Sequence, residues 1–443
     1  MSRLARSAPT LLVLLLAGAC SLGSLSTPPR PGVSIPTRRV LTNGVRVVVQ
    51  EFHESEVVAL QLWVQAGGRD EMPAELGLAH YLEHMLFKGT AVRAPGFVDR
   101  EIEGVGGRIN AGTSLDYTYY HTVLPGSRAL AGVEILADIA VNSTLSESLL
   151  DLEKQVVLEE MRLGEDIPRR YLFRRLYELL FDNHPYGRPV IGTADLVRGL
   201  SRNTLVSFYR RHYVPESFVL VVVGPVRTAE ILASVERTFG RLPRSGFQRL
   251  PLAPPPSLPS KKAAVGRPGT QAYLGMGWHA PKLDHADTPA VDLLTSILGQ
   301  SRSSRLTQAL RERTPLVTSV SAGYWALEAA GAIVVTAQLD PGNVEQTEVA
   351  VLEEVRRVRE RGVSAAELRR AVTAAEARHE FAGETAEGRA VTFGRAETLW
   401  RLDDELAYIN RLRSVTPEQI RVAARRYFDL QRYTRLALMP ERP

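Results

Sequence analysis

Two histidines and a glutamate fall within five consecutive residues of this 443-residue chain, His80-Tyr81-Leu82-Glu83-His84. Residues three and four apart are neighbours on one face of an α-helix, so both imidazoles can contact one metal ion with the carboxylate beside them. Neutral imidazole suits zinc, and a catalytic zinc site keeps three protein ligands and an open position for water. A carboxylate next to a ligand can take the proton of that water. The pattern therefore indicates a zinc site with its own base, unless it is a surface turn that carries two histidines by chance.

A third ligand should be acidic and lie on a second helix further along the chain. Residues 152–161 read as an amphipathic helix whose apolar positions are Leu152, Val156, Val157 and Met161. Glu153 and Glu160 are seven residues apart and therefore lie on the same side of this helix. Glu159 points about 100° away from Glu160 and is expected to be in solvent.

Four blocks of sequence resemble the inverzincin protease family, which includes pitrilysin, insulin-degrading enzyme and mitochondrial processing peptidase. His-x-x-Glu-His is the inverzincin motif. The blocks are residues 77–90, 106–111, 152–161 and 184–193, and with segments of the second half the resemblance covers about residues 39 to 440. It implies that His80, His84 and Glu160 hold one Zn²⁺ per chain and that Glu83 is the general base. It also implies that Glu153 orients a ligand.

The resemblance further implies a zinc-dependent endopeptidase that hydrolyses peptides or unfolded protein segments inside a closable chamber. Asn110 matches an asparagine near the substrate; the alternative is a strand-end turn residue. Arg311 matches a substrate-binding arginine of the second domain, but Thr318 stands where many relatives have a tyrosine. Three alternatives follow: reduced activity, compensation by Tyr324 or another donor, or a related chain that supplies the Arg/Tyr pair. Family members of this size usually form dimers, so a homodimer or such a heterodimer is expected.

Two other classes of function remain open at this point. The first is a non-catalytic peptide-binding or assembly subunit, which Thr318 favours and the intact metal motif disfavours. The second is a surface lipoprotein with a structural zinc, although such sites usually have four ligands that include cysteine. The formal charge of +5 is small for this length and the arginines are dispersed, which argues against a nucleic-acid partner.

The first twenty residues are predicted to be an export signal. Arg3 and Arg6 precede an apolar run at 11–19, which is too short to span a bilayer and suits a signal-peptide core. The run ends at Cys20, the only cysteine, in a segment that resembles a bacterial lipoprotein cleavage box. A lipid on Cys20 would anchor the exported chain to a membrane of the cell envelope, facing the periplasm; an ordinary secretory signal is the alternative. Ser21 permits passage to the outer membrane if Gram-negative sorting rules apply.

The remainder is predicted to be an α+β fold of two homologous domains, each a mainly antiparallel sheet packed with helices. Strand-like runs at 45–49, 57–64 and 218–223 belong to the first domain. Residues 21–38 form a predicted tether, 39–240 the catalytic zinc-binding domain, 241–262 a proline-rich linker, and 263–443 a degenerate second domain that closes the substrate chamber.

An internal repeat supports this division. The segment from Ser201 to Tyr213 recurs as Thr416 to Phe428, at an offset of 215 residues. Nearly the same offset places residues 82–86 on 294–298 and His80 on Asp292. The second copy therefore keeps the apolar helix face and lacks the metal site.

Overall fold

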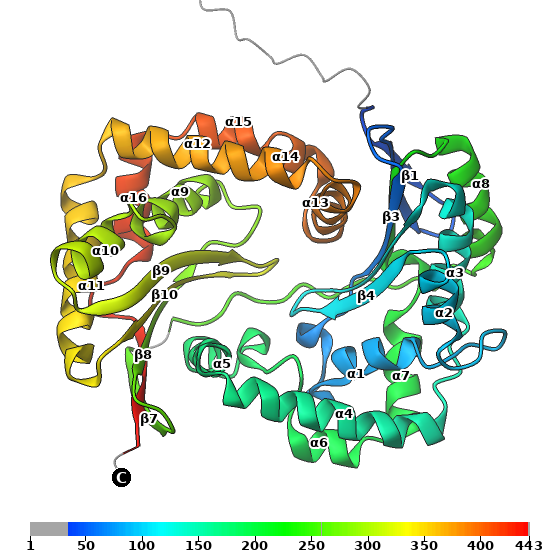
Figure 1. Ribbon diagram of the computed structural model, residues 1–443, viewed down its shortest axis with the longest axis horizontal. Helices are drawn as coiled ribbons and strands as arrows, with labels where there is room; N and C mark the ends of the chain where they lie inside the picture. The colour runs from blue at the N-terminus through cyan, green and yellow to red at the C-terminus, as the bar shows by residue number, and fades with distance from the viewer. Residues whose placement is uncertain (1–33, 258, 442–443) are drawn as a thin grey trace, which may run out of the picture.

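A computed structural model describes residues 34–257 and 259–441 of the chain (Figure 1). Cys20, the predicted signal and residues 21–33 of the predicted tether lie outside these ranges. Within them, no helix combines the length and the apolar character that crossing a membrane requires. The described chain folds into two α+β domains, each with a mainly antiparallel sheet packed by helices, as predicted.

The first domain is built on a six-stranded sheet in the order β1-β2-β6-β3-β5-β4. All neighbours are antiparallel except β2 and β6, which run parallel. The three strand-like runs of the sequence form β2, β3 and β6, and β4 is an edge strand. The strands are β1 (Thr37–Val40), β2 (Arg46–Glu51), β3 (Val57–Val64), β4 (Arg108–Thr113), β5 (Thr118–Pro125) and β6 (Phe218–Gly224).

The second sheet has five strands in the order β7-β11-β8-β10-β9, with β7 and β11 parallel and the other neighbours antiparallel. Without β1, the first sheet has the same order and the same directions, so the repeat seen in the sequence is a repeat of topology. The strands are β7 (Lys261–Arg267), β8 (Ala272–Ala280), β9 (Val317–Ala326), β10 (Gly331–Leu339) and β11 (Thr434–Pro440).

Each domain covers one face of its sheet with its own helices. In the first domain these are α1 (Leu78–Leu86), α2 (Phe97–Glu103), α3 (Ala129–Val141), α7 (Arg202–His212) and α8 (Thr228–Thr238), with α4 (Glu147–Asp166) and α6 (Ala194–Gly199) packed outside α1. In the second they are α9 (Thr288–Gly299), α10 (Arg305–Thr307), α11 (Val344–Arg361) and α16 (Pro417–Tyr427), with α12 (Ala365–Ala382), α14 (Leu402–Leu406) and α15 (Tyr408–Arg413) nearby.

The opposite face of each sheet is covered by a helix from the other domain. Helix α13 (Ala386–Leu399) of the second half packs on β3 and β6, and α5 (Pro168–Phe181) of the first half packs on β8 and β11 (Figure 1). Both contacts bury apolar side chains, among them Trp63 and Phe393 in one and Leu176 and Leu436 in the other. The two domains are therefore separate along the chain but interlocked in space.

Two of the predicted boundaries differ from the elements observed. Strand β1 begins at Thr37, so the last two residues of the predicted tether pair with β2. Strand β7 begins at Lys261, so the last two residues of the predicted linker, 261 and 262, belong to this strand. The described residues between Leu242 and Ser260 form no helix or strand, in keeping with their proline content.

Candidate active site

Helix α1 carries the histidine motif. Its apolar residues Leu78, Ala79, Leu82, Met85 and Leu86 are buried in the core of the first domain, which leaves the polar residues on the opposite face. The carboxylate of Glu71 accepts hydrogen bonds from the backbone N–H groups of Gly77, at 3.0 Å, and Ala79, at 2.8 Å. These N–H groups have no partner inside the helix, so Glu71 anchors the start of α1. Burial raises the pKa of Glu71 to about 8, against the effect of the two N–H donors.

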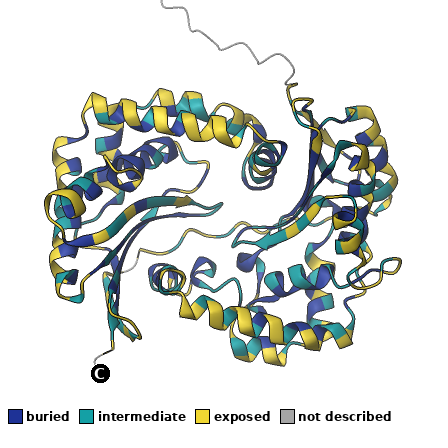
Figure 2. Ribbon diagram, viewed as in Figure 1, coloured by how far each residue is buried: buried dark blue, intermediate teal, exposed yellow. Residues whose placement is uncertain are grey.

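Helix α4 supplies the acidic residues, and the Tyr81 hydroxyl joins it to α1 by donating to the carbonyl of Leu150. The face of α4 that is buried differs from the predicted one. Leu152 and Val156 remain 65% and 51% exposed, whereas Glu153 and Val157 are buried. Exposed residues run along much of α4 (Figure 2), because only a narrow strip of the helix meets the rest of the domain. Glu159 is exposed and pairs with Arg162, as its direction on the helix predicted.

The structure brings His80, His84 and Glu160 together. Glu160 Oε2 lies 3.5 Å from His80 Nε2 and 3.6 Å from His84 Nε2. Zinc bonds of about 2.0–2.1 Å in a tetrahedral site separate the ligand atoms by roughly 3.3–3.4 Å, which matches the two distances to Glu160 closely. All three ligand atoms lie within 4.8 Å of one another. In the described part of the chain, no other group of three His, Cys, Asp or Glu residues is gathered closely enough to hold a metal ion. Glu160 keeps 46% of its side-chain exposure and the histidines 12% and 19%, so the cluster is open on one side.

Glu153 holds one of these histidines in place. Its Oε1 lies 2.8 Å from His84 Nδ1, and its Oε2 lies 2.8 Å from Lys88 Nζ. The bond to Nδ1 turns His84 Nε2 toward Glu160, which is how carboxylates orient metal-binding histidines. Burial alone would raise the pKa of Glu153, but the hydrogen bonds from His84 and Lys88 outweigh it and lower the pKa. His80 Nδ1 is buried and has no such partner.

Glu83 lies beside the cluster and is held by a residue that the sequence did not single out. Thr113, the last residue of β4, donates its hydroxyl to Glu83 Oε2 at 2.5 Å. Burial raises the pKa of Glu83, and the hydrogen bond from Thr113 opposes this shift. A raised pKa brings a carboxylate closer to the range in which it can both accept and return a proton. Residues 108–113 are not among the predicted strands; recognising a strand there would have put Ile109, Ala111 and Thr113 on one face, and this is the signal that could have found Thr113.

Comparison with known proteins shows which family the chain belongs to. Residues 46–194 match the family model described as insulinase (peptidase family M16), and residues 199–375 match the peptidase M16 inactive domain. An uncharacterised zinc protease of Streptomyces coelicolor is 32% identical over 409 residues, which cover 89% of this chain and 87% of that protein. The chain belongs to peptidase family M16. The family resemblance seen in the sequence is thereby confirmed.

Other M16 proteins are similar over different lengths. An uncharacterised zinc protease of Bacillus subtilis is 28% identical over 394 residues, 88% of this chain and 95% of the relative. A probable mitochondrial-processing peptidase subunit beta of Arabidopsis thaliana is 33% identical over 212 residues, 47% of this chain and 40% of that protein. Homologues named as zinc proteases support a metallopeptidase role for this M16 chain.

Solved structures confirm the two-domain M16 fold. A protease from Helicobacter pylori superimposes with a TM-score of 0.87 at 23% identity, covering 92% of this chain and 100% of that one. A Pseudomonas fluorescens structure titled as a peptidase M16 inactive domain gives a TM-score of 0.85 at 19% identity, covering 92% and 99%. At these identities the likeness concerns the fold alone.

Asn110 lies on the same strand of the M16 domain as Thr113 but on the opposite face. It is the third residue of β4 and is exposed, and its Oδ1 accepts a hydrogen bond from the N–H of Ala111 at 2.8 Å. Asn110 is therefore an edge-strand residue and not the strand-end turn residue that was the alternative. The structure does not bring it into contact with Glu83.

The second-domain residues matched to the family's substrate-binding pair make local contacts in this structure. Arg311 lies exposed on a π-helical turn, Gln308–Arg313, and its nearest carboxylate is that of Glu312 at 3.9 Å. Thr318 donates its hydroxyl to the carbonyl of Gln338 at 2.9 Å. The hydroxyl of Tyr324 donates to the carbonyl of Pro281 at 2.7 Å, and its ring packs on the second core. In this M16 structure the Tyr324 hydroxyl is therefore engaged within the second domain.

A cavity of about 940 Å³ borders Glu160 and Thr113. Its walls come from α4, α5, the segment after Tyr186 and the β9–β10 hairpin, so both domains contribute. Aromatic lining comes from Phe173, Tyr177, Tyr186 and Trp325. The charged lining is mainly positive, with Arg162, Arg170, Arg174, Arg175, Arg188 and Arg198 against Glu160, Glu165 and Glu178.

Proposed function

We propose that the protein is a zinc-dependent endopeptidase with one Zn²⁺ per chain, held by His80, His84 and Glu160. The observation that carries this proposal is the spacing of the three ligand atoms, 3.5 Å and 3.6 Å from the shared carboxylate oxygen. A set of two imidazoles and one carboxylate that is open to solvent on one side is typical of catalytic rather than structural zinc. The names of the relatives, zinc proteases of family M16, support the same activity.

The residues around the cluster have distinct tasks in peptide hydrolysis. Zinc bound here would polarise the scissile carbonyl and acidify the attacking water. Glu83 takes a proton from that water and returns it to the nitrogen of the leaving amine. Thr113 fixes the Glu83 carboxylate through its 2.5 Å hydrogen bond, and Glu153 fixes His84. The base and the ligands are thus arranged before substrate binds, which lowers the cost of reaching the transition state.

The proposed substrate is a peptide or an unfolded protein segment. Strand β4 is the outer strand of the first sheet, and an extended peptide can pair with such an edge through its main chain. Side chains of the peptide would then enter the cavity beside Glu160. Its lining carries six arginines and three glutamates. Four of the arginines pair with carboxylates, and the remaining excess of positive charge favours acidic side chains there.

Replacement of Glu83 by glutamine tests the mechanism. The amide cannot take a proton, so turnover of an unstructured acidic peptide should fall by about 10²- to 10⁴-fold. Bound zinc, measured by metal analysis, should stay near one per chain, and a chelator should abolish the activity of the parent until zinc is restored. Glu159→Gln is the matched control, because Glu159 is exposed on α4 and points away from the cluster. Equal rates for the Glu83→Gln protein and its parent would refute the mechanism.

One observation favours the second candidate, a non-catalytic peptide-binding or assembly subunit. Thr318 cannot replace a phenol, and the hydroxyl of Tyr324 already donates to Pro281. A protein of this kind would bind peptides without zinc-dependent turnover, so the peptide assay separates the two candidates.

We further propose that the mature chain is a lipoprotein of the cell envelope, anchored through Cys20, and that it works as a homodimer or with a related chain carrying the Arg/Tyr pair. The size of the chain is the reason for a dimer, and the absence of a tyrosine at position 318 is the reason for a related partner, because a second copy would also carry threonine there. Detergent extraction of membranes followed by sizing should recover the protein at twice the chain mass or with an equimolar partner. An active monomer in the soluble fraction would refute both points.

A further inference from the structure

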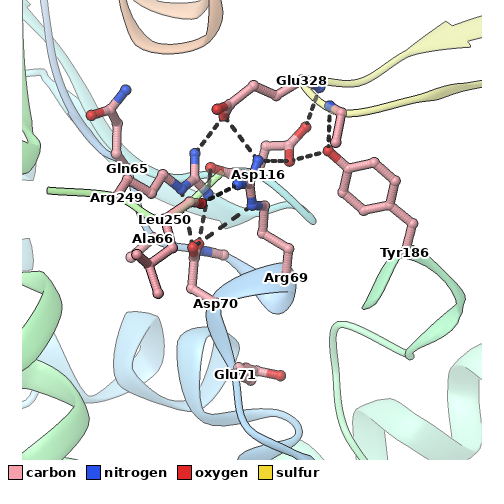
Figure 3. Close-up of polar contacts among 12 residues, drawn as sticks. Gln65, Ala66, Arg69, Asp70, Glu71, Asp116, Tyr186, Arg249, Leu250 and Glu328 are labelled. Atoms are coloured by element: carbon pink, nitrogen blue, oxygen red, sulfur yellow. Dashed lines mark hydrogen bonds and ion pairs between the residues drawn. The ribbon is translucent and has the colours of Figure 1, made fainter. Parts of the chain in front are cut away.

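Five charged side chains and a tyrosine meet where the two domains join (Figure 3). This junction network consists of Arg69, Asp70, Asp116, Tyr186, Arg249 and Glu328. Arg249 belongs to the linker and Glu328 to the β9–β10 hairpin of the second domain, whereas the others belong to the first domain. The side chains of Arg69, Asp116 and Arg249 are 2%, 0% and 8% exposed, so the charges are satisfied by one another rather than by water.

Arg249 is the centre of the junction network. Its guanidinium binds both carboxylate oxygens of Asp70, at 3.0 Å and 2.6 Å, and donates to the main-chain carbonyl of Asp116 at 2.7 Å. Its remaining nitrogen, Nη1, lies 2.7 Å from Glu328 Oε2. One linker side chain therefore ties the segment before α1 to the hairpin of the other domain.

The hairpin of the second domain is also held through its backbone. The N–H of Glu328 donates to Asp116 Oδ2 at 2.9 Å, and the N–H of Ala329 donates to the Tyr186 hydroxyl at 2.9 Å. That hydroxyl donates in turn to Asp116 Oδ1 at 2.7 Å. The carboxylate of Glu328 also lies 3.2 Å from Arg69 Nη1. Moving the hairpin away would remove one partner from each of the buried groups Arg69, Asp116 and Arg249, which is costly.

The junction network adjoins the anchor of the metal helix. Asp70 is followed directly by Glu71, whose carboxylate accepts from the N–H groups of Gly77 and Ala79 at the start of α1. Arg188 donates to the carbonyl of Glu71 at 2.8 Å and closes the segment from the other side. Residues 69–71 thus carry the domain junction at one end and the start of the histidine helix at the other.

We propose that Glu328 and Arg249 are positioning residues for helix α1. Docking of the hairpin fixes residues 69–71, and Glu71 then fixes the turn of α1 that precedes His80. A domain without metal ligands therefore contributes to the geometry of the metal site through its hairpin. The catalytic part of this inference rests on the proposed function, whereas the effect on the order of α1 does not.

The test compares Glu328→Gln with Arg38→Gln in the full-length protein. Arg38 pairs with Glu397 across the other contact between the domains, 2.7 Å apart, and does not touch the segment before α1. Hydrogen exchange of residues 78–86 is measured in metal-free protein, and zinc affinity is measured by competition with a chelator. Glu328→Gln should speed exchange in α1, weaken zinc binding about tenfold or more and lower kcat with little change in KM. Arg38→Gln should change none of these.

Equal exchange and equal zinc affinity in the Glu328→Gln protein and its parent would overturn the inference. An effect of Arg38→Gln as large as that of Glu328→Gln would also overturn it, because domain contact in general would then be the cause. If Glu328→Gln does not fold, Arg249→Lys keeps the charge but loses the two-pronged bond to Asp70, and the same readouts apply to it. A parent that binds zinc without hydrolysing peptides would refute the proposed function, while exchange and affinity would still decide this inference.

Discussion

Helices α1 and α9 occupy equivalent places in the two domains, yet only α1 carries a metal cluster. Every residue of α9 except Asp292 is buried, whereas His80, Glu83 and His84 of α1 remain partly exposed. Asp292, which stands in the place of His80, accepts a hydrogen bond from the hydroxyl of Tyr408 at 3.2 Å. The same topology therefore supports a reactive surface in one copy and a closed core in the other.

The helices that cross α1 and α9 explain this difference. Helix α4 turns Glu153 and Glu160 toward α1, whereas α12 buries Leu368, Ala371 and Ala375 in the second core. The buried carboxylate of Glu153 requires partners, which His84 and Lys88 supply, so the packing of α4 against α1 depends on these side chains. Duplication preserved the scaffold, and the chemistry depends on a few side chains at one helix crossing.

The largest expected effect comes from replacing equivalent residues of α1 and α9 by alanine, one at a time. His84→Ala should abolish zinc binding and peptide hydrolysis, because it removes a metal ligand and leaves Glu153 buried with one partner fewer. Ser296→Ala, at the equivalent place in α9, should leave both unchanged. Metal analysis and a peptide assay on the two variants provide the measurement. Zinc retained at full occupancy by the His84→Ala protein would break the comparison.

Helices α13 and α5, each of which covers the sheet of the other domain, differ in how they pack against that sheet. Gly394 of α13 faces Trp63, and a Cβ at this glycine would lie 2.0 Å from the indole nitrogen. In the contact between α5 and the second sheet, the glycine lies on the sheet instead. A Cβ at Gly275 of β8 would lie 3.2 Å from Leu176 of α5. Gly394→Ala should therefore lower the free energy of unfolding by about 1–3 kcal/mol and Gly275→Ala by less. Urea unfolding of both variants measures the difference; equal losses would contradict this account of the packing.

The smallest effect concerns the hydrogen bond between Thr113 and Glu83. Burial raises the pKa of Glu83 above its ordinary 4.5, and the base must be ionised, so kcat/KM should fall as pH drops through a value above 4.5. Thr113→Val removes a bond that lowers this pKa. The acid limb of the pH profile should then move to higher pH, and kcat/KM near neutrality should fall about tenfold. Thr113→Ser keeps a hydroxyl and should leave the profile in place, whereas identical profiles for parent and valine variant would contradict the role of the bond.

Much of the fold and the cluster could be predicted from the sequence because both depend on local patterns. Runs such as residues 57–64 are apolar enough to identify buried strands, and His80, Glu83 and His84 are related by the geometry of one helix turn. The repeat offset of 215 residues gave the equivalence of α7 and α16 and of β6 and β11. The helix period placed Glu153 and Glu160 on one side of α4, and the family resemblance assigned Glu160 to the metal.

Features that depend on long-range packing could not be predicted. Helix α4 exposes Leu152 and Val156 because few elements cover it, which no periodicity reveals. Thr113 meets Glu83 only because β4 lies beside α1. Arg249 lies in a segment whose prolines indicate a linker and conceal its role as a buried ion-pair partner. The exchange of α5 and α13 likewise leaves no trace in composition or spacing.

That exchange sets the order in which the protein can fold. During synthesis, all strands of the first sheet are present once β6 has emerged. The face of this sheet that α13 covers stays exposed until residues 386–399 follow, close to the end of the chain. The first half alone would expose Trp63 and its apolar neighbours to solvent and to aggregation. Neither half can therefore bury all of its apolar surface before the other has folded. A chain cut at the linker would have to reassemble from two fragments that each expose such a surface.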